Sequence, residues 1–247
     1  MPLAAANPNR PMTEVAPARP SSTVVLARDA GTSPELFLVE RPAKAAFGAS
    51  YVFPGGVVEP CDSTAAAYCT GIDPATANRR LGVDEDGLDY FVAAIRELFE
   101  ETGVLLAATE ADRATLDDCR RRLNDASLDW PDFLAAHSVA LDAGQLHYFS
   151  HWITPNVFPK RFTTRFFVAE LPPGQEPSHD PIELTGGAWL SARDALDRND
   201  IKLPFPTIKT LEALADLDSV SALVDWARRR EESGVETIHP AMPSGLR

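Results

Sequence analysis

The chain has 247 residues, of which 45% are hydrophobic, so it can form one large domain with an ordinary globular core. Its formal net charge of -13 at pH 7 argues against nucleic acid and anionic membranes as partners, because like charges repel. An acidic protein can still bind a polyphosphate when divalent metal ions lie between the two negative partners.

Three features of the sequence bear on its compartment. The cysteines Cys61, Cys69 and Cys119 show neither a CxxC pair nor any other metal-ligand spacing, which favours a reducing environment. No apolar run approaches the length of a membrane span. Residues 1–22 are rich in Pro and Ala and lack the apolar centre of a signal peptide. We therefore expect a cytoplasmic protein.

The first third of the chain is predicted to contain strands and a glycine turn. Residues 1–20 are predicted to form a disordered tail, and residues 21–247 a single domain. The strand-like runs 23–27 and 36–40 flank turn residues at 29–34, which predicts a hairpin. Residues 52–58 read as a strand end, a sharp turn at Gly55-Gly56 and a second short strand. Residues 63–87 are small, polar and acidic, and they predict an inserted loop with room for a short helix.

Helices and strands are mixed in the rest of the chain. Apolar residues recur at helical spacing from 88 to about 101, and Thr102-Gly103 ends that helix. A second insertion at about 105–145 has helical segments at 112–123 and 130–136. Strand-like runs follow at 146–154, 161–170 and 188–190, then a helix at 191–196 with Ser191 as its N-cap. C-terminal helices are predicted at about 205–232. Because no βαβ rhythm is visible, the pattern favours an α+β fold.

The most informative segment is residues 96–104, with the sequence RELFEETGV. Glu97, Glu100 and Glu101 stand at i, i+3 and i+4, so they share one face of the predicted helix, opposite its apolar residues. Three clustered carboxylates repel one another and favour a bound cation such as Mg²⁺ or Mn²⁺. Taken alone, the segment also fits a solvated face on which Arg96 and Glu100 form an ordinary i,i+4 pair.

Together with Gly55-Gly56, this segment resembles the signature of the Nudix hydrolases, GX5EX7REUXEEXGU, in which U is a bulky apolar residue. Residues 96–104 match every fixed position of its second half, and Gly56 with Asp62 matches the first half, with Asp in place of Glu. Residues 63–95, 33 in number, stand where the family has seven. The resemblance implies a Nudix-like α/β/α sandwich with a curved mixed sheet and helical insertions.

The resemblance also implies roles for individual residues. The metal ligands would be Glu97, Glu100, Glu101 and the Gly55 carbonyl, with Gly56 and Asp62 in support. Arg96 would orient a glutamate or Asp62. The base that deprotonates the attacking water would be Glu97 or Glu183, and the sequence does not decide between them.

An insertion inside the signature resembles the coenzyme A and acyl-CoA diphosphatase branch of the family. The segments WITP (152–155), KRFTTRFF (160–167) and LPFPT (203–207) are similar to that branch. It implies cleavage of coenzyme A or acyl-CoA to 3',5'-ADP and (acyl-)4'-phosphopantetheine. Arg41, Lys160, Arg161 and Arg165 are the expected substrate cations. The last three equally fit charges that protect a sheet edge. An arginine that other coenzyme A enzymes carry before FPGG is absent, and Lys44 is the nearest cation.

Other functions remain open at this point. An ADP-sugar or dinucleotide diphosphatase is the first alternative, although the cysteines and SQPWPFPxS segment of NADH diphosphatases are absent. A non-catalytic ligand sensor usually loses the signature carboxylates, which are intact here. An isopentenyl-diphosphate isomerase needs a cysteine that Cys61 and Cys69 do not match. The expected partner is a small-molecule diphosphate, and a homodimer is compatible with the sequence.

Overall fold

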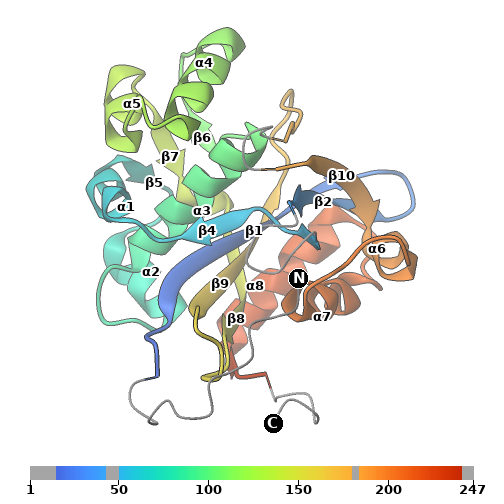
Figure 1. The fold of residues 1–247 in the computed structure, drawn as a ribbon. Helices are drawn as coiled ribbons and strands as arrows, with labels where there is room; N and C mark the ends of the chain where they lie inside the picture. The colour runs from blue at the N-terminus through green and yellow to red at the C-terminus, as the bar shows by residue number, and fades with distance from the viewer. Residues whose placement is uncertain (1–14, 43–49, 180–183, 241–247) are drawn as a thin grey trace, which may run out of the picture.

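The computed structural model describes residues 15–42, 50–179 and 184–240. These residues form a mixed sheet, a second small sheet and helices on both sides (Figure 1). The elements in chain order are β1 (Arg19–Asp29), β2 (Pro34–Arg41), β3 (Ser50–Val52), β4 (Gly55–Val57), α1 (Pro60–Ala65), η1 (Ala66–Tyr68), β5 (Cys69–Thr70), α2 (Pro74–Leu81), α3 (Gly87–Thr102), β6 (Ala107–Ala108), α4 (Arg113–Asn124), α5 (Trp130–Ala136), β7 (Ala140–Asp142), η2 (Ala143–Gln145), β8 (His147–Ile153), β9 (Phe162–Glu170), β10 (Gly186–Ser191), α6 (Ala192–Asp197), α7 (Phe205–Leu214), α8 (Val220–Ser233) and β11 (Thr237–Ile238).

The main sheet has the strand order β10-β2-β1-β9-β8-β11, with β3 paired to β2 and β4 paired to β1. β1 and β2 form the predicted antiparallel hairpin, and β1 pairs with β9 in parallel. β4 runs antiparallel to the start of β1, which brings Gly55 opposite Thr23. The glycine turn is thereby attached to the centre of the sheet.

The two faces of the sheet are buried under different helices. Alternate residues of β1 point to opposite sides: Val24 and Leu26 join one apolar cluster, and Val25 and Ala27 join the other. The first cluster includes the apolar side of α3 together with α5, and the second includes residues of α6, α7 and α8. Figure 1 shows α3 and α8 on opposite sides of the sheet. The predicted sandwich of helices around a mixed sheet is confirmed.

The segment predicted as an inserted loop contains more regular structure than expected. α1 begins with Pro60 after a capping box between Glu59 and Asp62, and α2 begins with Pro74 after the N-cap Asp73. Both helices bury small residues, such as Ala65 and Ala77, in the core. Short helices with few apolar residues carry too little periodicity to be recognised, so here the caps were the better signal.

Two further predictions concern the N-terminal segment and membrane-spanning helices. β1 begins at Arg19, inside the segment expected to be a tail, and residues 1–14 of that segment lie outside the described residues. In the part of the chain that the structure describes, no helix is both long and apolar enough to cross a membrane.

Candidate active site

The candidate site lies at the C-terminal half of α3, where three carboxylates share one side of the helix. α3 packs against β1 and β4 through its buried apolar residues, and it ends at Gly103, whose φ of 73° is left-handed. The side chains of Glu97, Glu100 and Glu101 are 15%, 23% and 5% exposed. All three therefore lie at the margin of the core rather than on an open, solvated face.

The glycine turn contacts these glutamates directly. The amide of Gly55 donates a hydrogen bond to Oε2 of Glu101 at 3.0 Å. Gly55 itself could not carry a side chain, because a Cβ would lie 2.3 Å from the Ser22 carbonyl oxygen. A Cβ on Gly56 would lie 2.2 Å from Oε1 of Glu97. Gly55 is therefore needed because β1 approaches so closely, and Gly56 because the Glu97 carboxylate of α3 does.

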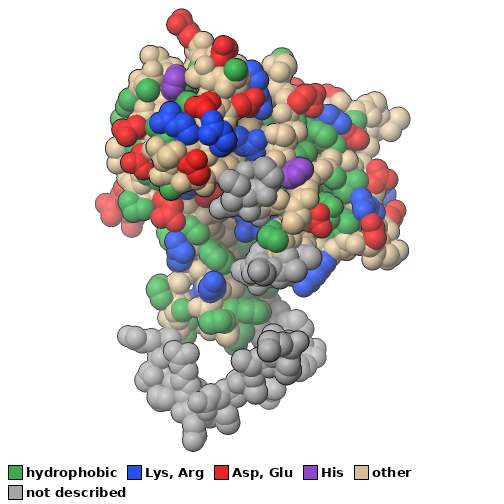
Figure 2. Space-filling view, turned by 45° about the horizontal axis from the view of Figure 1, so that its top comes forward, with side chains coloured by type: hydrophobic (Ala, Val, Ile, Leu, Met, Phe, Trp, Pro, Cys, Tyr) green, Lys and Arg blue, Asp and Glu red, His purple; other side chains and the backbone are tan. Residues whose placement is uncertain are grey.

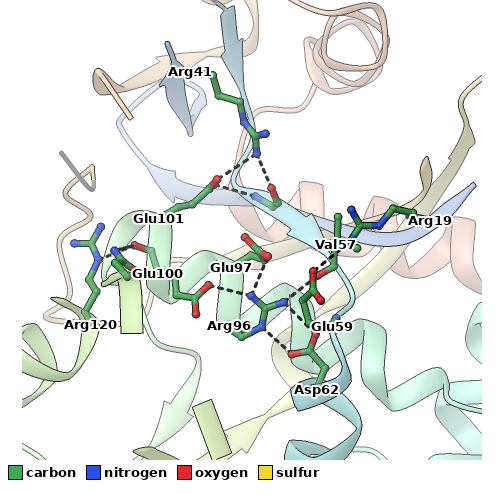
Figure 3. Close-up of polar contacts among 12 residues, drawn as sticks. Arg19, Arg41, Val57, Glu59, Asp62, Arg96, Glu97, Glu100, Glu101 and Arg120 are labelled. Atoms are coloured by element: carbon green, nitrogen blue, oxygen red, sulfur yellow. Dashed lines mark hydrogen bonds and ion pairs between the residues drawn. The ribbon is translucent and has the colours of Figure 1, made fainter. Parts of the chain in front are cut away.

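Arg96 organises the carboxylates from beneath (Figure 3). Its Nε and Nη2 donate to the two carboxylate oxygens of Asp62 at 2.8 and 3.1 Å, and Nη2 also donates to the Val57 carbonyl. Its Nη1 donates to Glu97 at 2.9 Å and to Glu100 at 3.0 Å. Asp62 is fully buried, and it also accepts from the Glu59 amide in the cap of α1. The expected partnership of Arg96 with Asp62 and the glutamates is thus present as direct contacts.

Burial disfavours the ionised form of two of these glutamates and so raises their pKa values. Loss of solvent raises the pKa of Glu100 to about 7, although Arg96 acts in the opposite direction. Burial also raises the pKa of Glu97, against the same guanidinium. Arg96 and Arg41 therefore compensate the negative charge only in part, and a divalent cation would favour the ionised carboxylates.

The oxygen donors fit a hard divalent cation in type, but their present partners are arginines. Within the described ranges, no three His, Cys, Asp or Glu side chains already converge as a metal-binding group. Glu97 and Glu100 contact Arg96, and Glu101 contacts Gly55 and Arg41. Carboxylate and carbonyl oxygens are the ligands that Mg²⁺ and Mn²⁺ prefer. At Glu101 an ion would meet the guanidinium of Arg41, whereas Arg96 contacts one carboxylate oxygen of Glu97 and one of Glu100.

Arg41, at the end of β2, contacts both the glycine turn and Glu101. Its Nη2 donates to the carbonyl of Gly55 at 2.7 Å and to Oε1 of Glu101 at 3.2 Å. The structure therefore brings this predicted substrate cation next to the predicted metal ligands, as Figure 3 shows.

The other predicted cations do not contact this group. Arg161 donates to the carbonyls of Thr154 and Ala16, and Lys160 is exposed in the connection before β9. Arg165 is 5% exposed, donates to the Leu81 carbonyl and lies over the ring of Tyr90. The expectation of a sheet edge is wrong, because β9 lies between β1 and β8. Because Arg165 is buried against Leu81 of α2 and Tyr90 of α3, it is not a candidate for contact with a substrate.

Glu183 lies outside the described residues, so its role stays a prediction. The described residues on either side of it are attached close to the site. The Ser178 amide donates to the Thr102 carbonyl at 2.8 Å, and the Thr185 amide donates to the Glu40 carbonyl at 2.9 Å.

A helix of the second insertion binds the C-terminal end of α3, a contact that the sequence analysis missed. Nε of Arg120 and Nδ2 of Asn124, both from α4, donate to the Glu100 carbonyl at 2.9 and 3.1 Å. Arg113 donates to the Gly103 carbonyl at 3.2 Å. Arg120 also donates to the hydroxyl and the carbonyl of Ser178. Cations at a helix C-terminus satisfy its last carbonyls and its dipole, but these residues lie on another helix, so no local pattern in the sequence indicates the contact.

Comparisons with known proteins agree with this geometry. The sequence model of the family described as "NUDT19 Nudix domain" matches residues 77–214. The human protein named acyl-coenzyme A diphosphatase NUDT19 is 26% identical to this chain, and the match covers 96% of this chain and 73% of that protein. The putative nudix hydrolase 7 of Caenorhabditis elegans is 27% identical, with 84% of this chain and 62% of that protein covered.

A solved structure shows the same fold. The crystal structure of a NUDIX hydrolase from Alicyclobacillus acidocaldarius superposes with a TM-score of 0.69 and 28% sequence identity. The superposition covers 87% of this chain and 97% of that one. Because the family match spans more than half of the chain and includes the whole of α3, the chain belongs to the NUDT19 Nudix domain family and is a Nudix hydrolase.

Proposed function

We propose that the protein hydrolyses the diphosphate bridge of coenzyme A or an acyl-CoA, giving 3',5'-ADP and (acyl-)4'-phosphopantetheine, with Mg²⁺ or Mn²⁺ as the cofactor. The observation that carries this proposal is the match to relatives named acyl-coenzyme A diphosphatase in human and in chicken. The insertion inside the signature and the three branch-like segments support the same substrate.

Nudix hydrolases generally use divalent metal ions, and the residues around Gly55 can supply the ligands. We propose that Glu97, Glu100, Glu101 and the Gly55 carbonyl hold the ion. A bound divalent ion would neutralise the diphosphate charge and activate water. Arg96, anchored on the buried Asp62, would keep the carboxylates aligned while they carry the ion. Glu97 or Glu183 would accept the proton of the attacking water.

Basic side chains other than Arg96 would recognise the substrate. We propose that Arg41 contacts the diphosphate, because its guanidinium already lies beside Gly55. Lys160 and Arg161 are proposed for the 3'-phosphate of coenzyme A. Although Arg161 is engaged with two backbone carbonyls, Lys160 next to it is exposed. A phosphate bound by a single cation is worth about 1.5–3 kcal/mol of charge-assisted hydrogen bonding.

The proposal also covers the cellular compartment and the oligomeric state of the protein. We propose a cytoplasmic enzyme that acts on a small molecule rather than on nucleic acid or membranes, either as a monomer or as a homodimer. On the face shown in Figure 2, acidic and basic side chains are both spread over the surface, and several basic ones lie together in its upper part. We further propose one catalytic domain that carries the insertions at about 63–87 and 105–145.

The test is a comparison of substrates with product identification. Coenzyme A, a short acyl-CoA, 3'-dephospho-coenzyme A and ADP-ribose are incubated with the protein and Mg²⁺, and the products are separated by chromatography. We expect 3',5'-ADP from the first two substrates. The dephospho form should lose about 10- to 100-fold in kcat/KM, the equivalent of one charge-assisted contact. Lys160→Ala or Arg161→Ala should erase that preference, whereas Arg229→Ala should not.

Two results would overturn the substrate assignment. One is equal kcat/KM for coenzyme A and its dephospho form. The other is rapid hydrolysis of ADP-ribose without cleavage of either coenzyme A substrate. The second result would leave a Nudix hydrolase of the ADP-sugar type.

A further inference from the structure

One guanidinium nitrogen occupies the position where two predicted metal ligands meet. Nη2 of Arg41 donates both to the Gly55 carbonyl, at 2.7 Å, and to Oε1 of Glu101, at 3.2 Å. Glu101 is 4% exposed, and its other carboxylate oxygen accepts from the Gly55 amide. Arg41, Gly55 and Glu101 thus form a closed ring of hydrogen bonds around the backbone N–H and carbonyl of one residue, Gly55 (Figure 3).

The backbone fixes this ring. Arg41 is the last residue of β2, where it pairs with Ser50 of β3, and Gly55 begins β4 on β1. β2 and β4 are both hydrogen-bonded to β1, so the sheet holds the Arg41 backbone and the Gly55 peptide near each other. The side chain of Arg41 is 32% exposed, which leaves it room to move, whereas Glu101 lies on a buried helix.

We propose that Arg41 is an internal cation that competes with the divalent ion for the Gly55 carbonyl and Glu101. Metal binding displaces its guanidinium, which then becomes available to the phosphate oxygens of the substrate. The proposal rests on the metal site proposed above. It adds that the arginine and the metal cannot share these two oxygens, so one residue links metal binding to phosphate binding.

The competition follows from charge and donor chemistry. Two cations beside one carboxylate repel each other, and an oxygen already engaged by a guanidinium is a weaker ligand for a metal. Once displaced, an arginine presents a planar fork of donors that suits phosphate oxygens. Removing the positive charge of Arg41 should therefore tighten metal binding and weaken substrate binding. If Arg41 were only a structural support, its loss would not tighten metal binding while weakening substrate binding.

The test measures metal affinity in the absence of substrate. Binding of Mn²⁺ to the full chain is followed by electron paramagnetic resonance for the wild type, Arg41→Gln and Arg41→Lys. Arg19→Gln is the matched control, because Arg19 forms an exposed ion pair with Glu59 and contacts none of the predicted ligands. We expect about fivefold tighter Mn²⁺ binding in Arg41→Gln, the gain from losing one partly exposed charged contact. Arg41→Lys should stay near the wild type, and Arg19→Gln should be unchanged.

A second readout guards against a variant that is merely unstable. The increase in thermal unfolding midpoint on adding Mn²⁺ should be larger in Arg41→Gln than in the wild type, because tighter binding to the native state stabilises it more. The KM for the coenzyme A substrate should rise in the same variant. Equal or weaker Mn²⁺ binding in Arg41→Gln would overturn the proposed competition.

Glu101→Gln separates this inference from the proposed function. If Glu101→Gln loses Mn²⁺ affinity while Arg41→Gln is unchanged, the metal site stands and only the competition fails. If Glu101→Gln binds Mn²⁺ as the wild type does, both the proposed metal site and the inference are contradicted.

Discussion

At the scale of single residues, two arginines have different roles at the candidate site. Arg96 positions the glutamates, and we propose that Arg41 competes with the metal ion. Arg96 is 5% exposed and binds the fully buried Asp62 through both carboxylate oxygens, so it can hold glutamates in place without needing solvent. Arg41 is partly exposed and binds the oxygens that a metal needs. The two arginines differ because an arginine on a buried carboxylate is costly to move, whereas a partly exposed one is not.

Gly56 gives a prediction at this scale. In Gly56→Ala the new Cβ would meet the Glu97 carboxylate, with Oε1 at 2.2 Å and Cδ at 2.3 Å, so Glu97 must turn away. We expect kcat to fall at least about tenfold, together with an overpacking cost of about 1–3 kcal/mol in unfolding free energy. Steady-state kinetics and urea unfolding measure the two effects.

A control separates stability from catalysis in this experiment. Gly174 has open space around its Cβ position, but its φ of 77° makes an alanine strained there. Gly174→Ala should therefore lose stability and keep its kcat. A Gly56→Ala enzyme with wild-type kcat would show that Glu97 does not act from its observed position.

At the scale of elements, α4, in the segment predicted to be an insertion, acts as a cap for the helix that carries the glutamates. α4 brings Arg113, Arg120 and Asn124 to the last carbonyls of α3, including that of Glu100. Arg120 is 9% exposed and also holds Ser178, in the chain that follows β9. The insertion thus contributes to the site without placing a side chain among the carboxylates.

Removing that cap should disturb the site more than the fold. In Arg120→Ala, the Glu100 carbonyl keeps the Asn124 contact but loses its charged one, which we expect to cost about 1–3 kcal/mol of unfolding free energy. Mn²⁺ affinity should fall because Glu100 and Glu101 lie on the loosened turn. Arg120→Lys should restore part of both losses. Arg121→Ala, on the exposed side of α4, should change neither quantity. Unchanged Mn²⁺ affinity in Arg120→Ala would contradict a positioning role.

Local features of the site were predictable from the sequence, and long-range ones were not. The carboxylates of α3 follow from spacing, and the glycine turn follows from residue type, because both properties are local. The contact of Arg41 with Glu101 joins residues far apart in the chain, and no periodicity encodes it. Arg165 resembled an edge charge because strand neighbours cannot be read from one strand, yet β9 proved to be central. Tertiary contacts determine both the Arg41–Glu101 contact and the central position of β9, so neither could be predicted from local sequence.

At the scale of the whole molecule, the sheet separates the layer that contains the candidate site from a second layer of helices. α3 and both insertions cover one face, and α6, α7 and α8 cover the other. The layer with the candidate site holds three clustered carboxylates in a protein that carries a net charge of -13. An acidic enzyme with an anionic substrate therefore depends on its cations, and we propose that a divalent ion and Arg41 act at the same point.

The most direct test of the central claim is release of 3',5'-ADP from coenzyme A as a function of Mg²⁺ concentration. The measurement compares the wild type with Glu100→Gln, Glu101→Gln and the exposed control Glu85→Gln. We predict that EDTA stops wild-type turnover. Glu100→Gln and Glu101→Gln should lose at least about a hundredfold in kcat, while Glu85→Gln keeps the wild-type rate. Wild-type rates at saturating Mg²⁺ for both Glu100→Gln and Glu101→Gln would contradict this claim.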